Sequence, residues 1–149
     1  MGVKNGINID VRPVTCDDAA EVCNLCCTDL GYQCDKTLVK ERISQLDSGR
    51  EAVFVAILDG YIVGFIHVEK YNTLYFETMA NILGIAVSSK YRKMGVGKAL
   101  IEQSEEWANE NDIALMRLNT GLGRKGAHEF YKHMGYGSEK EQLRFVKRL

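Results

Sequence analysis

The sequence lacks the features that mark nucleic-acid-binding and membrane proteins. Its net charge is −1, from 19 basic and 20 acidic residues mixed along the chain, and it contains no basic block. Because nucleic-acid binding needs clustered Lys and Arg, that function has no support. No apolar run approaches the roughly 20 residues that span a bilayer. Residues 1–8 are polar and glycine-rich, unlike a signal peptide. We therefore expect a cytoplasmic protein with no nucleic-acid or membrane partner.

Proline is nearly absent, and cysteine is confined to one region. The single proline is Pro13, and no linker, repeat or low-complexity tract interrupts the 149 residues, of which 46% are hydrophobic. This predicts one domain, residues 1–149, with its own core. The five cysteines all lie between Cys16 and Cys34, without a second pair or a nearby His. A zinc site would need further ligands, so we expect packed, reduced thiols and no metal.

Hydrophobic periodicity and turn residues predict a mixed α/β domain. Asp59-Gly60 indicates a tight hairpin, and Thr15 with Asp18 indicates a helix cap. Strands 78–87 and 114–120 are expected to be parallel, because the connection between them contains a helix. The expected strands are 7–14, 52–58, 61–69, 78–87 and 114–120, with a final antiparallel pair from 136 onward and at 143–148. The expected helices are 15–30, 36–46, 97–111 and 125–134, and residues 71–77 are expected to form a loop or strand edge.

The most informative stretch joins an apolar strand to a helix through glycines. Residues 82–87 are apolar, and Gly95 and Gly97 follow a basic turn. The first N–H groups of a helix lack internal partners and carry the positive end of its dipole. Glycine lets a phosphate approach these groups closely. With Arg92, Lys93 and Lys98 nearby, the stretch predicts a diphosphate ligand.

Four interpretations of this glycine turn are possible. A nucleotide P-loop needs Gly at position 92 and Ser or Thr after Lys98, and the chain has Arg92 and Ala99 there. A dinucleotide fold needs a third glycine where Leu100 stands, and an acidic residue at the end of the next strand. An ordinary strand–helix connection, with glycines for tight packing, also accounts for the pattern. The fourth reading is the motif Arg-x-x-Gly-x-Gly.

That motif, residues 92–97, resembles the acetyl-CoA pyrophosphate loop of the GNAT N-acetyltransferase superfamily. Residues 11–15 resemble the opening strand of that family, and residues 127–136 resemble its penultimate helix and the strand after it. The resemblance spans nearly the whole chain. Within the superfamily, the chain is similar to small aminoglycoside N-acetyltransferase-like members. It implies the GNAT acyl-CoA N-acyltransferase fold, β-α-α-β-β-β-α-β-α-β-β, whose parallel fourth and fifth strands splay apart for acetyl-CoA.

The resemblance also implies an activity, the transfer of the acetyl group of acetyl-CoA to an amine by direct attack in a ternary complex. Tyr131 is implied as the general acid that protonates the leaving thiolate, although packing on an apolar helix face would also explain it. A backbone N–H at Ile85 or Val87 would polarise the thioester carbonyl. The residues implied in cofactor binding are Ile85, Ala86, Val87, Arg92, Lys93, Met94, Gly95, Val96, Gly97, Lys98, Asn119 and Arg124.

The sequence departs from the family at the general base. Asn81 and Asn119 stand where many members carry a glutamate, and an amide cannot accept the proton. Glu77 has the same strand parity as Asn81, so it is our candidate base. Glu69 and His67 are further candidates, and water-mediated deprotonation is an alternative.

The sequence indicates only the chemical class of the acceptor substrate. Carboxylates and tyrosines in segments that flank the acceptor side in this fold suit a cationic small-molecule amine such as an aminoglycoside or polyamine. These residues are Asp29, Tyr32, Glu69, Tyr71, Tyr75 and Glu77. The alternatives are a protein or peptide N-acetyltransferase and a non-catalytic acyl-CoA-binding module. A homodimer is expected from the resemblance alone.

Overall fold

The computed structural model describes residues 2–4, 7–138 and 140–149. The chain divides into two compact units, Met1–Leu118 and Asn119–Leu149. The first contains β1 (Gly2–Lys4), β2 (Ile7–Pro13), the 3-10 turn η1 (Cys16–Asp18), α1 (Ala19–Thr28), α2 (Lys36–Ser44), β3 (Glu51–Leu58), β4 (Tyr61–Thr73), β5 (Phe76–Val87), the 3-10 turn η2 (Ser89–Tyr91), α3 (Val96–Glu110) and β6 (Leu115–Leu118). The second contains α4 (Lys125–His133). A single domain over 1–149 stays a prediction.

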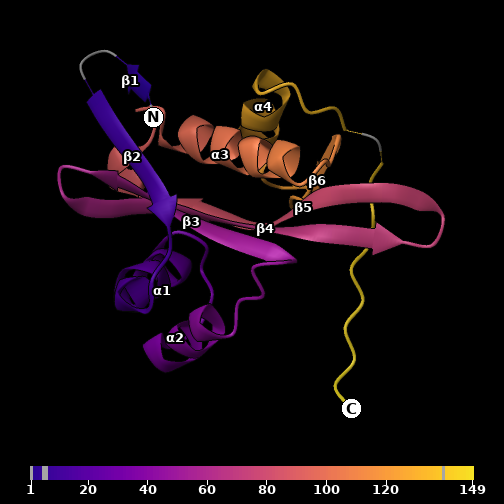
Figure 1. Cartoon of the computed structure of the whole chain (residues 1–149), viewed down its shortest axis with the longest axis horizontal. Helices are drawn as coiled ribbons and strands as arrows, with labels where there is room; N and C mark the ends of the chain where they lie inside the picture. Colours follow the sequence, from indigo (N-terminus) through magenta and orange to yellow (C-terminus); the bar gives the residue numbers. More distant parts are fainter. Residues whose placement is uncertain (1, 5–6, 139) are drawn as a thin grey trace. The chain divides into compact units, whose positions relative to one another are not determined.

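The first unit is a mixed sheet between helices. Its strand order follows the sequence from β1 to β6, and every neighbouring pair is antiparallel except β5 and β6, which are parallel. Helices α1 and α2 lie on one side of the sheet and α3 on the other (Figure 1). The predicted fold class and the predicted parallel pair are both confirmed.

The core lies on both faces of β4. On the α3 face, Leu100 and Ile101 are fully buried. Gly64 of β4 permits this contact, because a Cβ there would lie 3.0 Å from Leu100 Cδ1 and 2.9 Å from the carbonyl oxygen of Ala86. On the α1 face, a hydrophobic cluster joins the helix to the sheet. Its buried members are Val22, Leu25, Val55, Phe65 and Ala86.

The predicted helix caps and the predicted hairpin turn are present in the structure. The Asp18 carboxylate accepts a 2.7 Å hydrogen bond from the Thr15 N–H, and it also binds the Arg12 guanidinium at 2.8 and 2.9 Å. Asp35 caps α2 by accepting the Leu38 N–H at 2.8 Å. In the hairpin between β3 and β4, both turn residues have positive φ, 53° at Asp59 and 79° at Gly60. A two-residue hairpin of this kind matches the twist of its strands.

Residues 71–77, expected as a loop or strand edge, are mostly strand, because β4 runs on to Thr73 and β5 begins at Phe76, with cross-strand pairs at Tyr71–Met79 and Thr73–Phe76. The prediction of a final strand pair is wrong, since residues 136–138 and 140–149 form no strand. Phe145 there is 87% exposed. An isolated hairpin without a covered apolar face is marginal in water, which explains why sequence alternation alone does not produce one.

No helix in the described ranges combines the length and the apolar character that a membrane crossing requires.

Candidate functional site

The turn between β5 and α3 exposes the start of a long helix. Its backbone takes positive φ at Lys93 (62°) and at Gly95 (89°), which directs the chain into α3. The first helical hydrogen bond runs from the Ala99 N–H to the Gly95 carbonyl at 3.0 Å. The preceding N–H groups of residues 96–98 therefore lie at the helix N-terminus, where backbone donors and the helix dipole favour an anion.

Basic side chains surround this N-terminus, and one buried carboxylate fixes the turn. Arg92 is 60% exposed and Lys98 is 48% exposed, so both are accessible to a ligand. Asp29, at the end of α1 and only 8% exposed, accepts the Ser89 N–H at 2.9 Å and lies 3.8 Å from Arg92 Nη2. Asp29 therefore ties α1 to the basic turn. Its predicted place on the acceptor side stays a prediction.

Strand β5 loses its parallel partner halfway along. Its pairing with β6 ends at Ile82, which lies opposite Leu118, and the described part of the chain has no β6 residue paired with β5 beyond that point. A β-bulge occurs at the same place, because Val68 pairs with Ile82 and His67 pairs with Gly84, which leaves Leu83 as an extra residue. Bulges bend a strand and re-aim its side chains. From Gly84 to Val87, β5 pairs with β4 and with no residue of β6.

A hydrogen-bonded polar row crosses the sheet beside this bulge. Glu51, Glu69, Asn81 and Arg117 are direct partners on β3, β4, β5 and β6 in turn. Asn81 is 7% exposed, and its Nδ2 donates to Glu69 Oε2 at 2.9 Å. Arg117 Nη1 donates to Asn81 Oδ1 at 2.7 Å. Asn81 therefore bridges an anion and a cation within a largely buried layer.

Further side chains contact the members of the row. Arg50 Nη1 lies 2.8 Å from the second oxygen of Glu69, and His67 Nε2 lies 2.8 Å from Glu51 Oε1. The Arg117 guanidinium stacks 4.3 Å above the Tyr71 ring. Burial raises the pKa of Glu51, but the hydrogen bond with His67, the Asp47 N–H and nearby positive charge outweigh it and lower this pKa overall. The side chains of Glu51 and Glu69 are each only 13% exposed, so the row keeps both carboxylates largely out of water.

The structure separates the two glutamates that the sequence offered as a base. The side chain of Glu69 is 13% exposed and contacts Asn81 directly. Glu77 is exposed on β5, four residues from Asn81, which is about 13 Å along a strand. A register shift between the pairs Tyr71–Met79 and Thr73–Phe76 interrupts the strand alternation between Glu77 and Asn81. The catalytic role of Glu77 stays a prediction. The contact between Glu69 and Asn81 could have been found only from the strand register.

The second unit carries three of the predicted site residues. Tyr131 lies on α4, where its ring makes edge contacts with Phe130 at 5.3 Å and with Tyr136 at 6.3 Å. Burial raises the pKa of Tyr131, and the positive charge of Arg124 offsets this only in part. Its hydroxyl therefore stays protonated at neutral pH. Arg124 and Asn119 are both exposed.

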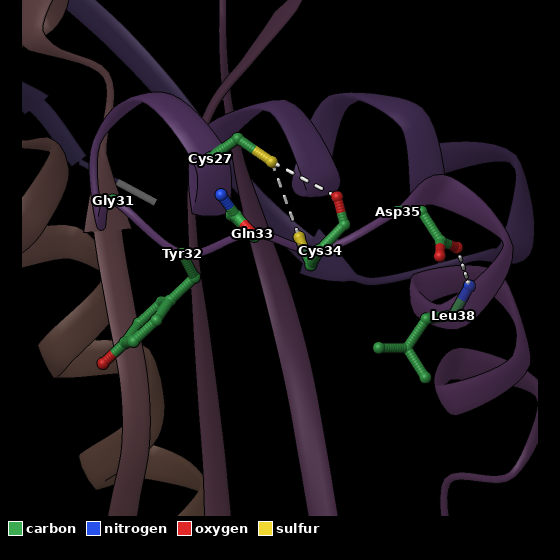
Figure 2. A pocket seen from close by; sticks show the side chains of 7 residues that line it. All are labelled: Cys27, Gly31, Tyr32, Gln33, Cys34, Asp35 and Leu38. Atoms are coloured by element: carbon green, nitrogen blue, oxygen red, sulfur yellow. Dashed lines mark hydrogen bonds between the residues drawn. The ribbon is translucent and has the colours of Figure 1, made fainter.

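A pocket of about 570 Å³ lies between α1 and α2, and no residue of the polar row lines it (Figure 2). Tyr32, predicted on the acceptor side, lines it and is 62% exposed. Cys27 and Cys34 also line it. The sequence predicts packed, reduced thiols, but it has no signal that would place Cys34 beside Cys23 and Cys27 of α1.

The chain is similar to known proteins in both sequence and structure. The sequence profile of the Acetyltransferase (GNAT) family matches residues 19–136. An uncharacterized N-acetyltransferase of Methanocaldococcus jannaschii is 34% identical over 105 residues, covering 66% of this chain and 46% of that protein. Aminoalkylphosphonate N-acetyltransferase of Salmonella typhimurium is 25% identical over 142 residues, covering 94% of this chain and 91% of that protein. The solved structure of aminoglycoside N-acetyltransferase AAC(6')-Iy in complex with CoA has a TM-score of 0.82, with 22% identity over 99% of both chains.

The chain belongs to the GNAT acetyltransferase family, since the family profile covers it from the start of α1 to the residue after Gly135. The family predicted from residues 92–97 and 127–136 is confirmed. The chain spans 46% to 63% of the length of several curated relatives, including the archaeal protein.

We predict that Asn81→Ala destabilises the first unit by about 2–4 kcal/mol. The change removes the partner of a largely buried carboxylate and of a guanidinium, and uncompensated buried charge is costly. Asn109→Ala is the matched control, because Asn109 is exposed on α3, and a change of less than about 0.5 kcal/mol is expected. Urea unfolding followed by circular dichroism measures both. Equal effects in the two variants would show that the row contributes nothing to stability.

Proposed function

We propose that the chain is an N-acetyltransferase that moves the acetyl group of acetyl-CoA to a primary amine of a small molecule. The observation that carries this proposal is the arrangement along β5. The strand runs from a buried polar row at Asn81, through the bulge where β6 leaves it, to the glycine turn that begins α3. The single strand β5 would thus connect a binding site for the acceptor amine to a binding site for the diphosphate of acetyl-CoA. A homodimer and a cytoplasmic location stay predictions.

Acetyl-CoA would lie along the part of β5 that β6 leaves unpaired. Ile85, Ala86 and Val87 would pair with the pantetheine arm as a further strand does. An N–H at Ile85 or Val87 would stabilise the developing oxyanion, an interaction worth about 2.7–4 kcal/mol in enzymes that use it. Residues 92–98 would hold the pyrophosphate with helix N–H groups and positive charge. Asn119 and Arg124 are proposed as further cofactor contacts from the family resemblance.

Glu69 is the carboxylate that we propose for the acceptor amine. A primary amine is protonated at neutral pH and must lose a proton before it attacks the thioester. Asn81 cannot accept that proton, whereas the adjacent Glu69 carboxylate can, directly or through one water. Asn81 and Arg50 each bind one oxygen of Glu69 and so orient it. Glu77 is the alternative base.

A second acceptor class is an amine that also carries an acidic group. Two observations favour it. The polar row contains two arginines, Arg50 and Arg117, as well as its carboxylates. The relative aligned over nearly its full length is named for aminoalkylphosphonates, which carry both charges. Aminoglycosides and polyamines carry only positive charge at neutral pH, so the two classes are separable by experiment.

Thiol release from acetyl-CoA tests the proposed activity. We expect release only with an amine present, from a panel of aminoglycosides, polyamines, aminoalkylphosphonates, amino acids and short peptides. Tyr131→Phe should lower kcat about 100-fold with little change in cofactor affinity, because it removes the proposed proton donor. Tyr136→Phe is the matched control and should change kcat less than threefold. A blank without amine is needed, since the chain has five cysteines.

Absence of release with every amine, in protein that binds acetyl-CoA, would favour a non-catalytic acyl-CoA-binding module. Release with peptides alone would favour a peptide N-acetyltransferase.

The two candidate bases make a matched pair. We expect Glu69→Gln to lower kcat/KM about 100-fold, since the amide cannot accept a proton. Glu77→Gln should stay within about twofold of wild type, because Glu77 is exposed and distant along the strand from Asn81. Initial rates as a function of amine concentration measure both. The reverse order of effects would place the base at Glu77, as strand parity alone predicted.

Loss of the Arg50 ion pair is a second consequence of Glu69→Gln, and it requires its own control. Arg50→Met breaks the same pair and leaves the carboxylate in place. If Arg50→Met costs as much activity as Glu69→Gln, the ion pair rather than proton transfer explains the loss.

A further inference from the structure

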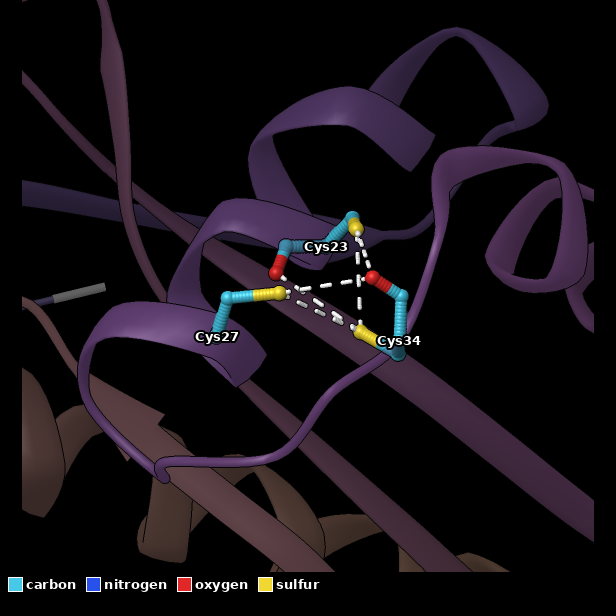
Figure 3. Close-up of side chains that lie close together, drawn as sticks. All are labelled: Cys23, Cys27 and Cys34. Carbon is cyan, nitrogen blue, oxygen red and sulfur yellow. Dashed lines mark hydrogen bonds between the residues drawn. The ribbon is translucent and has the colours of Figure 1, made fainter.

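Three thiols from two segments converge beside the α1–α2 pocket. Cys23 and Cys27 are four residues apart and therefore share one face of α1. Cys34 comes from the segment that precedes α2. The three sulfur atoms all lie within 4.8 Å of one another. Figure 3 shows the three side chains directed toward a common point.

The sulfur spacing is close to that of a metal–thiolate site. Cys34 Sγ lies 3.6 Å from Cys23 Sγ and 3.7 Å from Cys27 Sγ. Zinc–sulfur bonds of about 2.3 Å in a tetrahedron place sulfur atoms about 3.8 Å apart. An ion could therefore be bound with shifts of a few tenths of an ångström at these two pairs.

We propose that Cys23, Cys27 and Cys34 form a binding site for a thiophilic divalent ion of the zinc class. Three protein thiolates would hold the ion, and water would take the fourth position. Each thiol releases its proton when its sulfur binds the metal, so up to three protons are released for each ion.

The fourth position is available because the cluster opens to solvent. Cys23 is buried, Cys34 is half-buried and Cys27 is exposed. Cys27 and Cys34 also line the α1–α2 pocket, which leaves room for a water or another small ligand (Figure 2). Asp35 lies in the same pocket, but its carboxylate already caps α2 through the Leu38 N–H.

A bound ion would have a structural consequence. It would cross-link α1 to the segment before α2, including Gly31, which has a φ of 75°. Asp29 lies between these cysteines in sequence and anchors the basic turn through Ser89. The ion would therefore stiffen the end of α1 that supports the proposed cofactor site. The metal site itself does not depend on the proposed function.

Zinc titration of the full, reduced chain tests this proposal. The probe is Zn²⁺ alone, in competition with a chromophoric chelator and in the presence of a phosphine reductant. We expect one equivalent to bind. Cys34→Ser should weaken the affinity more than 100-fold, since even outer-shell partners change metal affinity 10- to 100-fold. Cys16→Ser is the control and should bind as wild type, because Cys16 lies outside the cluster.

Cobalt substitution gives an independent readout. Co²⁺ bound by several thiolates should show strong ultraviolet charge-transfer absorption, and this band should disappear in Cys34→Ser. Cys27→Ser provides a second variant whose exposed position makes misfolding a weak explanation, and circular dichroism checks its fold. Less than one equivalent of zinc in wild type, or equal affinity in Cys34→Ser and Cys16→Ser, would overturn the proposal.

Discussion

The end of the β5–β6 pairing at Ile82 is the constraint on which the candidate site depends. A strand that continues beyond its partner has backbone donors and acceptors on that edge, and these need other partners. On the paired side of this point, the hydrogen bonds of Asn81 with Glu69 and Arg117 join β4, β5 and β6 through their side chains. On the other side, β5 continues to the glycine turn. The polar row thus lies next to the point where pairing with β6 ends.

The two ends of this arrangement are supported by different helices. Helix α3 packs its apolar face on the sheet and directs its N-terminus at the turn. Helix α1 contributes Asp29, whose largely buried carboxylate accepts the Ser89 N–H and lies near Arg92. If the turn binds the diphosphate as proposed, fixing it beforehand would lower the entropic cost of binding, which is the general advantage of preorganisation.

The sequence predicted local features well and long-range contacts poorly. Apolar periodicity located α3 and the strands beside it, and Asp59-Gly60, Asp35 and the Gly95 turn act as their residue types predict. The contact of Glu69 with Asn81 depends on strand register, and the thiol cluster depends on how a loop returns to α1. Neither leaves a periodic signal. The alternation at residues 143–148 failed as a prediction, because a strand requires a partner as well as a pattern.

Calorimetric titration with CoA tests the central claim most directly, namely that the β5–α3 turn binds the diphosphate. We expect one CoA to bind each chain, and Arg92→Ala to weaken the affinity about tenfold or more, since a hydrogen bond to a charged group contributes about 1.5–3 kcal/mol. Arg148→Ala, which removes an exposed cation near the C-terminus, should bind as wild type. Absence of CoA binding, or equal affinity in the Arg92 and Arg148 variants, would contradict the account.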